Sequence, residues 1–187
     1  DTDVQDYTGS EKRGTCIEFV PDNSKGLFEN YHFRDEFIET MMRNYAYLNT
    51  GLTLVYNGKK YMSKNGLFDL LTDNMTVEPL YPIIHLQGED IEIVLTHTNQ
   101  SGEEYYSFVN GQHTVQGGTH QVAYREAIAR TIKEFFNKNQ EYSDIRNGVV
   151  GAIAINVSEP VFESQTKVKL GSKDMSPEGG LSVNKFV

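Results

Sequence analysis

The sequence predicts an α+β fold in which a mostly antiparallel sheet carries helices on one face. Three observations support this class. Short strand-like segments outnumber helical ones, their order is β, α, ββ, α, βββ, α, β, and a long helical segment separates the last two strands. Runs of strands between isolated helices favour antiparallel pairing over regular βαβ repeats.

The composition sets the limits of the interpretation. The chain has 187 residues, of which 38% are hydrophobic, enough for one large domain or one domain and part of a second. Its net charge of −9 argues against a protein whose main task is gripping nucleic acid, but it allows a small basic patch. One cysteine and the lack of a long apolar run predict a cytoplasmic location without a membrane span.

The first elements are a strand and a helix. Residues 14–20 alternate apolar and polar side chains, which predicts a half-buried strand ended by Pro21. Residues 33–49 have helical periodicity, and Gly51 is a suitable left-handed cap. The apolar stripe expected to face the core consists of Phe37, Met41, Tyr45 and Leu48.

A hairpin and a short helix come next. Segments 52–56 and 59–62 flank Asn57-Gly58, the dipeptide that favours a tight two-residue turn. Residues 67–71 then predict a short helix, and its start is assigned to Ser63 or Asn65.

Four strands and one long helix complete the predicted fold. Segments 82–87, 90–97 and 104–110 are separated by turn residues, which predicts a meander, and 111–118 is expected to be a polar loop. Residues 119–139 give the strongest helical pattern. Residues 149–157 are almost continuously apolar, which is typical of a strand covered on both faces, and 171–187 is a loop with a short apolar end.

Familiar catalytic motifs are missing from the sequence. It contains no P-loop, no G-x-G-x-x-G fingerprint and no G-x-S-x-G elbow. The five histidines and the single cysteine lack metal-ligand spacing, so no metal site is expected. A binding or relay module is therefore favoured over a self-contained catalyst.

The segment 116–120 brings two glycines to the start of the long helix, where Thr119 is an acceptable N-cap. Exposed amides at a helix start can bind an anion. The alternative is an ordinary tight turn into a capped helix, and the pattern alone favours that alternative.

Arg125 falls on an apolar stripe of the same helix, together with Val122, Ile128, Ala129, Ile132 and Phe136. A cation in this position needs a carboxylate, a carbonyl oxygen or access to water. Either it points into a groove, or it forms a buried ion pair or extends its charged end to water, and the pattern slightly favours the second interpretation.

The polar loop 159–167 follows the buried strand and ends in Lys167. A loop held by a rigid strand can present an ammonium group to a phosphate. Without further information, Lys167 and Lys169 are better described as solvated charges.

Four motifs change this interpretation. Phe162-Glu163-Ser164-Gln165-Thr166-Lys167, with Lys169-Leu170 after it, resembles the QTK loop of the GHKL-type ATPase subunits (the B subunits) of bacterial type IIA DNA topoisomerases. Gly117-Gly118-Thr119-His120 resembles their GGTH segment. The stretch from Gly14 to Asp22 is similar to their last ATPase-domain strand, and Tyr47-Leu48-Asn49-Thr50-Gly51 to a helix end. The matches occur in the family's order between residues 14 and 172, and the run 109–114 is more similar to topoisomerase IV than to gyrase.

The resemblance implies a fold and a site. Residues 1–31 would be the end of the ATPase domain with its exit segment, and 32–187 the transducer domain with a truncated last helix, a ribosomal-protein-like fold with a left-handed βαβ crossover. Lys167 would be the catalytic contact to the ATP γ-phosphate, with Gln165 beside it. Arg125 would face the cavity through which DNA passes.

The resemblance also implies cofactors and partners. ATP and Mg²⁺ would be bound mainly by an ATPase domain that this chain lacks, so the chain alone would be catalytically incomplete. The partners would be that domain, a second copy of the subunit when ATP binds, the DNA-cleaving subunit and transiently DNA. Two alternatives stay open: a relay module of a mismatch-repair or chaperone GHKL ATPase, and a standalone phosphate-binding protein that uses the helix start at Thr119.

Overall fold

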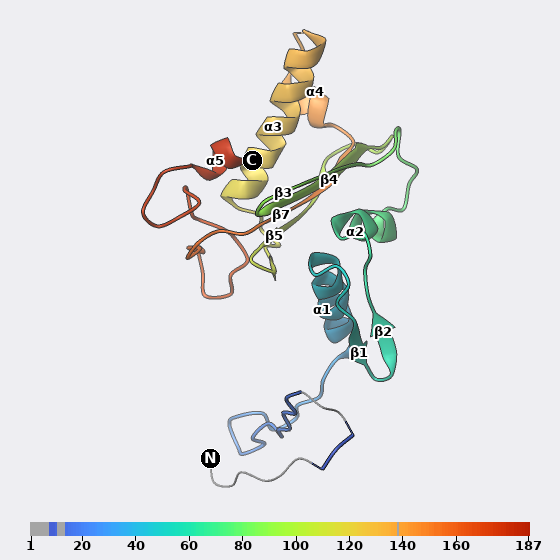
Figure 1. Cartoon of the computed structure of the whole chain (residues 1–187), viewed down its shortest axis with the longest axis vertical. Coiled ribbons are helices and arrows are strands. Elements are labelled where there is room, and N and C mark those ends of the chain that lie inside the picture. The colour runs from blue at the N-terminus through green and yellow to red at the C-terminus, as the bar shows by residue number, and fades with distance from the viewer. Residues whose placement is uncertain (1–7, 11–13, 138) are drawn as a thin grey trace. The chain divides into compact units, whose positions relative to one another are not determined.

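A five-stranded sheet with its most apolar strand at the centre organises most of the chain (Figure 1). The strands are β3 (Ile84–Gly88), β4 (Ile91–His97), β5 (Glu104–Val109), β6 (Gln112–His113) and β7 (Val149–Ile155), in the order β3-β4-β7-β5-β6. Only β5 and β7 run parallel, and the other neighbours are antiparallel. The predicted α+β class with a mostly antiparallel sheet is confirmed.

The computed structural model describes residues 8–10, 14–137 and 139–187. The chain divides into two units, 1–35 and 36–187. In the described part of the first unit, residues 14–20 do not form the predicted strand, and Ile17 and Phe19 are exposed. A strand requires a neighbour for its backbone hydrogen bonds, and none of the described segments pairs with this one.

The predicted meander is wrong at one step. β3 and β4 form the expected hairpin, but β4 and β5 do not pair, because β7 lies between them. Almost every residue of β7 is buried, so the strand is covered on both faces, as its sequence predicts. Such a strand buries the most apolar surface at the centre of the sheet, whereas the turn at 99–102 only specifies that the chain reverses direction.

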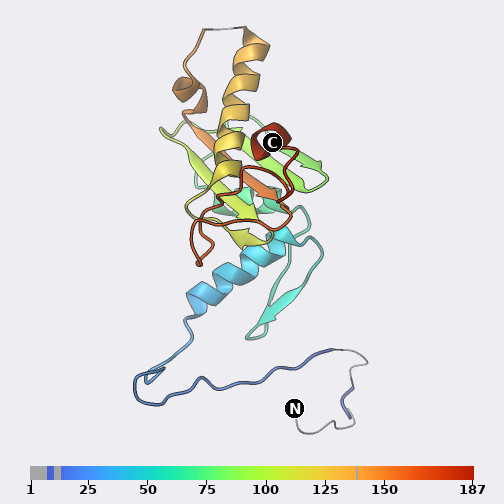
Figure 2. The same ribbon diagram turned by 90° about the vertical axis from the view of Figure 1, so that its left-hand side faces the viewer.

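Helices lie on both faces of the sheet. α3 (Thr119–Phe136) covers one face, where Tyr124 and Ile128 belong to a core cluster with Ile153 of β7 (Figures 1 and 2). The other face packs against α2 (Leu67–Asn74), whose Leu67, Leu70 and Leu71 are fully buried. The sequence predicted helices on one face only, and β7 explains the second layer because its apolar side chains point both ways.

The helix α1 (Asp35–Leu48) matches its predicted range but not its predicted buried face. Its buried residues are Ala46 and Tyr47, whereas Phe37 and Met41 of the predicted stripe are more than half exposed. Only the last turn of the helix reaches the core, where the Tyr47 hydroxyl donates a 2.6 Å hydrogen bond to Asp73 of α2.

Two of the hairpins turn at Asn-Gly dipeptides. β1 (Leu54–Tyr56) and β2 (Lys59–Tyr61) pair around Asn57-Gly58, and both turn residues have positive φ angles, 47° and 80°. This hairpin is confirmed. Asn110-Gly111 has the same geometry and joins β5 to β6, a short strand inside the predicted loop 111–118.

The start of α2 is held partly from outside the helix. Gly66 occupies the cap position, and the Ser63 hydroxyl accepts its amide. The Leu67 amide donates a 2.8 Å hydrogen bond to Glu92 of β4. The helix is therefore confirmed, while part of its capping comes from a strand 25 residues away.

Two short helices, α4 (Tyr142–Arg146) and α5 (Val183–Phe186), were not predicted and both pack along α3. Of the helices in the described ranges, none is long and apolar enough to cross a membrane.

Candidate functional site

The loop that contains Lys167 is closed by its own backbone. Phe162 and Leu170 form an antiparallel bridge, and the Glu163 amide donates to the Lys169 carbonyl oxygen at 3.0 Å. Inside this closure, the Lys167 amide donates to the Ser164 carbonyl oxygen at 3.0 Å. Residues 163–169 therefore form a defined turn on a short stem.

The two lysines of this loop are in different electrostatic states. The Lys169 ammonium lies 3.0 Å from the Glu163 carboxylate. Lys167 is exposed, and its ammonium forms no hydrogen bond or ion pair with another side chain in the described part of the chain. Gln165 is also exposed, while Ser164 and Thr166 bond to each other at 2.7 Å. The loop therefore presents one uncompensated cation, Lys167.

The glycine segment 116–120 and the lysine loop meet at the base of this loop. The Gln116 amide donates to Val168, the Leu170 amide to Gly117, and the Thr119 amide to Leu170, at 2.9, 3.1 and 3.2 Å. Gly118 and Leu170 form a parallel bridge. The segment 116–119 thus pairs with 168–170 along the first turn of α3. We call this pairing the seam.

Gly118 allows the seam to form. Its φ angle is +135°, and a Cβ atom there would lie 2.8 Å from the Leu170 Cα and closer still to that residue's amide nitrogen and carbonyl oxygen. Any side chain would separate the two backbones.

Thr119 is not the helix cap that the sequence predicted. Gly118 takes that position, and the Thr119 hydroxyl instead donates a 2.6 Å hydrogen bond to the Ser172 carbonyl oxygen. The Thr119 amide is already bonded to Leu170, so it is not available to an anion. The simpler interpretation of this helix start, a turn into a helix, describes the geometry.

A buried polar network lies beneath the seam. The Gly117 amide donates to the Thr114 carbonyl oxygen at 2.8 Å, and the Thr114 hydroxyl donates to the Ser107 carbonyl oxygen at 2.8 Å. His120 is fully buried, with its Nε2 atom 3.2 Å from the Thr114 hydroxyl, and its Nδ1 atom has no partner in the described structure. Burial lowers the pKa of His120 to about 4, so the ring is neutral at physiological pH.

Arg125 forms an ion pair with Glu103, which lies just before β5. Its Nε and terminal nitrogen atoms each lie 2.8 Å from a carboxylate oxygen, and Arg146 adds a third contact. Burial disfavours the charged carboxylate, but hydrogen bonds from Arg125, Tyr105 and Arg146 outweigh it and lower the pKa of Glu103 to about 2. The Arg125 side chain is 37% exposed, and Val122 and Phe136 of its predicted stripe are also exposed. The predicted buried stripe is therefore confirmed at Ile128 and Ala129 and wrong at its two ends, and Arg125 forms the ion pair of the alternative interpretation at a half-exposed position.

The structure does not bring Arg125 and Lys167 into one cavity. Arg125 lines a cavity of about 750 Å³ along α3 together with Lys169 and Lys173, and the acids Glu126 and Glu163 also contribute to its wall. Lys167 is not part of this wall.

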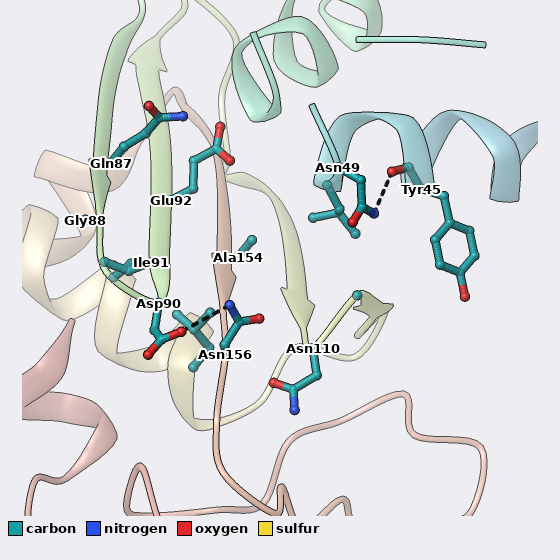
Figure 3. A pocket seen from close by; sticks show the side chains of 13 residues that line it. Tyr45, Asn49, Gln87, Gly88, Asp90, Ile91, Glu92, Asn110, Ala154 and Asn156 are labelled. Atoms are coloured by element: carbon teal, nitrogen blue, oxygen red, sulfur yellow. Dashed lines mark hydrogen bonds between the residues drawn. The ribbon is translucent and has the colours of Figure 1, made fainter. Parts of the chain in front are cut away.

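A second cavity, of about 800 Å³, opens where the turns of the sheet meet the end of α1 (Figure 3). Asn49, which directly follows α1, lines one side and its amide donates to the Tyr45 carbonyl oxygen at 2.9 Å, while Asn156 donates to Asp90 on the side of the sheet. The wall contains carboxylates and amides but no lysine or arginine, so it is not suited to a phosphate. No motif or spacing in the sequence indicated this cavity.

The described side chains do not offer a metal site. Within the described ranges, no group of three or more His, Cys, Asp or Glu residues is placed to hold an ion.

Known proteins resemble this chain along most of its length. The model of the family described as DNA gyrase B matches residues 35–184. The B subunit of DNA topoisomerase 4 from Borreliella burgdorferi is 38% identical over 184 residues, which is 98% of this chain and 30% of the relative. The B subunit of DNA gyrase from Helicobacter pylori strain J99 is 32% identical over 182 residues, 87% of this chain and 23% of the relative. The chain thus spans less than a third of these two relatives.

Solved structures show the same fold. The 43K ATPase domain of Thermus thermophilus gyrase B, in complex with an aminocoumarin, has a TM-score of 0.63 at 26% identity, covering 88% of this chain and 48% of that one. The gyrase B-subunit of Myxococcus xanthus has a TM-score of 0.66 at 18% identity and covers 88% of this chain and 53% of that one. The second likeness concerns the fold alone.

Proposed function

Because the chain belongs to the DNA gyrase B family, we propose that it is the transducer region of the B subunit of an ATP-dependent type IIA DNA topoisomerase. The resemblance that four sequence motifs predicted is confirmed by the family match. Identity is higher to the Borreliella topoisomerase 4 relative than to the Helicobacter gyrase relative, in the direction that the run 109–114 predicted. The activity of the whole enzyme, its substrates and its partners are part of the proposal.

The proposed contact to nucleotide is Lys167, with Gln165 beside it. The observation that carries this assignment is the difference between the two lysines of the loop. Lys169 is neutralised by Glu163, whereas the Lys167 ammonium is exposed and unpaired within the described structure. An ammonium in this state can bind the γ-phosphate of ATP as a point charge without first breaking an ion pair.

This arrangement suits a nucleotide sensor. Lys167 lies on a loop anchored to the sheet, and the nucleotide would be held by another part of the subunit. The contact would exist while the γ-phosphate is in place and would change after hydrolysis. A difference of this kind between two states is what a nucleotide switch requires.

The domain assignment follows the same proposal. Residues 1–31 would be the end of the ATPase domain with its exit segment, and 32–187 the transducer. ATP and Mg²⁺ would be held mainly by the rest of the ATPase domain. The partners would be that domain, a second copy of the same subunit and the DNA-cleaving subunit, all in the cytoplasm.

Arg125 is proposed to face the cavity through which DNA passes. Its partial exposure and its cavity with Lys169 and Lys173 support this role. Its pairing with Glu103 means that a DNA phosphate would have to share or displace that carboxylate.

The central test is Lys167→Ala in the full-length subunit. Removal of one phosphate contact that forms in the transition state is expected to lower ATP turnover at least tenfold without unfolding the protein. Lys169→Ala is the matched control and should lose much less, because that ammonium already pairs with Glu163. Normal turnover in a folded Lys167→Ala subunit would exclude the proposed contact.

A further inference from the structure

We propose that the segment Gly117–His120 is the seat that positions Lys167, and that Thr119 is the positioning residue within it. This inference rests on the function proposed for Lys167.

The residues of the seat form hydrogen bonds in two directions. Gly118 and Thr119 bond towards the lysine loop, through Leu170 and Ser172. His120 bonds towards Thr114 beneath it, and Gly117 bonds both ways, because its amide donates to Thr114 while its carbonyl oxygen accepts the Leu170 amide. The seat therefore joins the stem of the loop to the β5–β6 hairpin and the sheet.

Ser172 connects the two legs of the stem to each other and to Thr119. Its carbonyl oxygen accepts the Thr119 hydroxyl, and its own hydroxyl accepts the Val161 amide at 2.8 Å. The amides of Gly171 and Ser172 in turn donate to the Val161 carbonyl oxygen at 2.8 and 3.1 Å. The bond from Thr119 to Ser172 thus fixes both legs of the stem, the one that enters the loop and the one that leaves it.

The position of the Lys167 ammonium depends on this stem. No hydrogen bond or ion pair of the Lys167 side chain within the described structure holds it, so the backbone of the loop determines where it can reach. Reacting groups displaced by about 1 Å can lose roughly 100-fold in rate. A loosened stem should therefore slow the chemical step more than it weakens the binding of ATP, whose other contacts lie elsewhere.

The experiment compares Thr119→Val with Thr119→Ser in the full-length subunit. Valine has the shape of threonine but no hydroxyl, so it removes the bond to Ser172. Loss of one hydrogen bond is expected to lower kcat for ATP about fivefold with a smaller change in KM, whereas serine keeps the hydroxyl and should retain the parent rate. Thermal unfolding of each variant shows that it is folded. Ser172→Ala, which frees the Val161 leg, serves if the valine variant does not fold.

A combination with Lys167→Ala separates positioning from general damage. If Thr119 acts through Lys167, Thr119→Val should cause no further loss of kcat in the Lys167→Ala background. If the fold losses of kcat in the two single variants multiply in the double variant, the inference is overturned. A normal kcat for both Thr119→Val and Ser172→Ala would overturn it as well, and either outcome would leave the role of Lys167 intact. Normal turnover of Lys167→Ala alone would instead remove the proposed function.

Discussion

Gly118 and Leu170 approach each other backbone to backbone, and the approach leaves no room for a side chain on Gly118. Gly118→Ala should therefore lower the free energy of unfolding by about 2 to 4 kcal/mol, because it combines an unfavourable φ angle with a collision against main-chain atoms. Urea unfolding measures the loss. Gly180→Ala is the control, since Gly180 also has a positive φ angle but no atoms near its would-be Cβ, and about 1 kcal/mol is expected there. Equal losses of unfolding free energy in the two variants would mean that the backbones of the seam move apart to accommodate the methyl group, which contradicts the prediction.

Arg125 has two candidate tasks, and two variants separate them. If Arg125 acts as a cation that faces DNA, Arg125→Gln should reduce ATP-driven strand passage more than it reduces ATP binding. Glu103→Gln, which frees the guanidinium, should then preserve strand passage. If Arg125 instead serves to link α3 to the start of β5, both variants should lose stability and activity together. Strand-passage assays, nucleotide binding and unfolding on both variants give the answer.

His120 should make the fold sensitive to acid. Its pKa is about 4 in the folded chain and near 6.5 when unfolded, so between these values the unfolded state binds the extra proton. Stability is then unaffected by His120 above pH 6.5 and falls as the pH drops towards 4, by roughly 3 kcal/mol in total. In the His120→Asn variant the free energy of unfolding should fall less steeply between pH 6.5 and 4. Urea unfolding at successive pH values measures this slope. An unchanged slope would show that other groups dominate.

Glu92 should stabilise α2 from the sheet. Its carboxylate accepts the Leu67 amide at 2.8 Å and lies 2.9 Å from His85. Glu92→Ala should cost about 1 to 2 kcal/mol, as loss of a helix cap does, and Glu92→Gln should cost less because an oxygen acceptor remains. Glu89→Ala, on the exposed turn nearby, should be close to neutral. A neutral Glu92→Ala would show that the local bonds of Ser63 and Asp69 suffice to hold the start of α2.

The elements with a strong local signal could be predicted from the sequence. The Asn57-Gly58 turn, the long helix α3 and the doubly covered strand β7 each depend on nearby residues or on a simple apolar pattern. The lysine loop was identified by motif, and its position directly after β7 followed from the same apolar run.

Relationships between distant segments could not be predicted. The place of β7 between β4 and β5 depends on which pairing buries the most surface, and no turn residue encodes it. The partners Glu103 for Arg125 and Ser172 for Thr119 lie 22 and 53 residues away, and a single sequence carries no signal of such contacts. β6 is a different case, because Asn110-Gly111 repeats the hairpin signal used correctly at Asn57-Gly58.

The central position of β7 also determines the order in which the sheet can assemble. β4 ends at His97 and β5 at Val109, but the strand that joins them begins only at Val149. Until the ribosome has released that strand, both neighbours expose an unpaired edge, the state in which sheet proteins associate wrongly. β7 must therefore pair on both sides with strands that precede it in the chain, and α3 and α4, which lie between β5 and β7, can form from local contacts before it does.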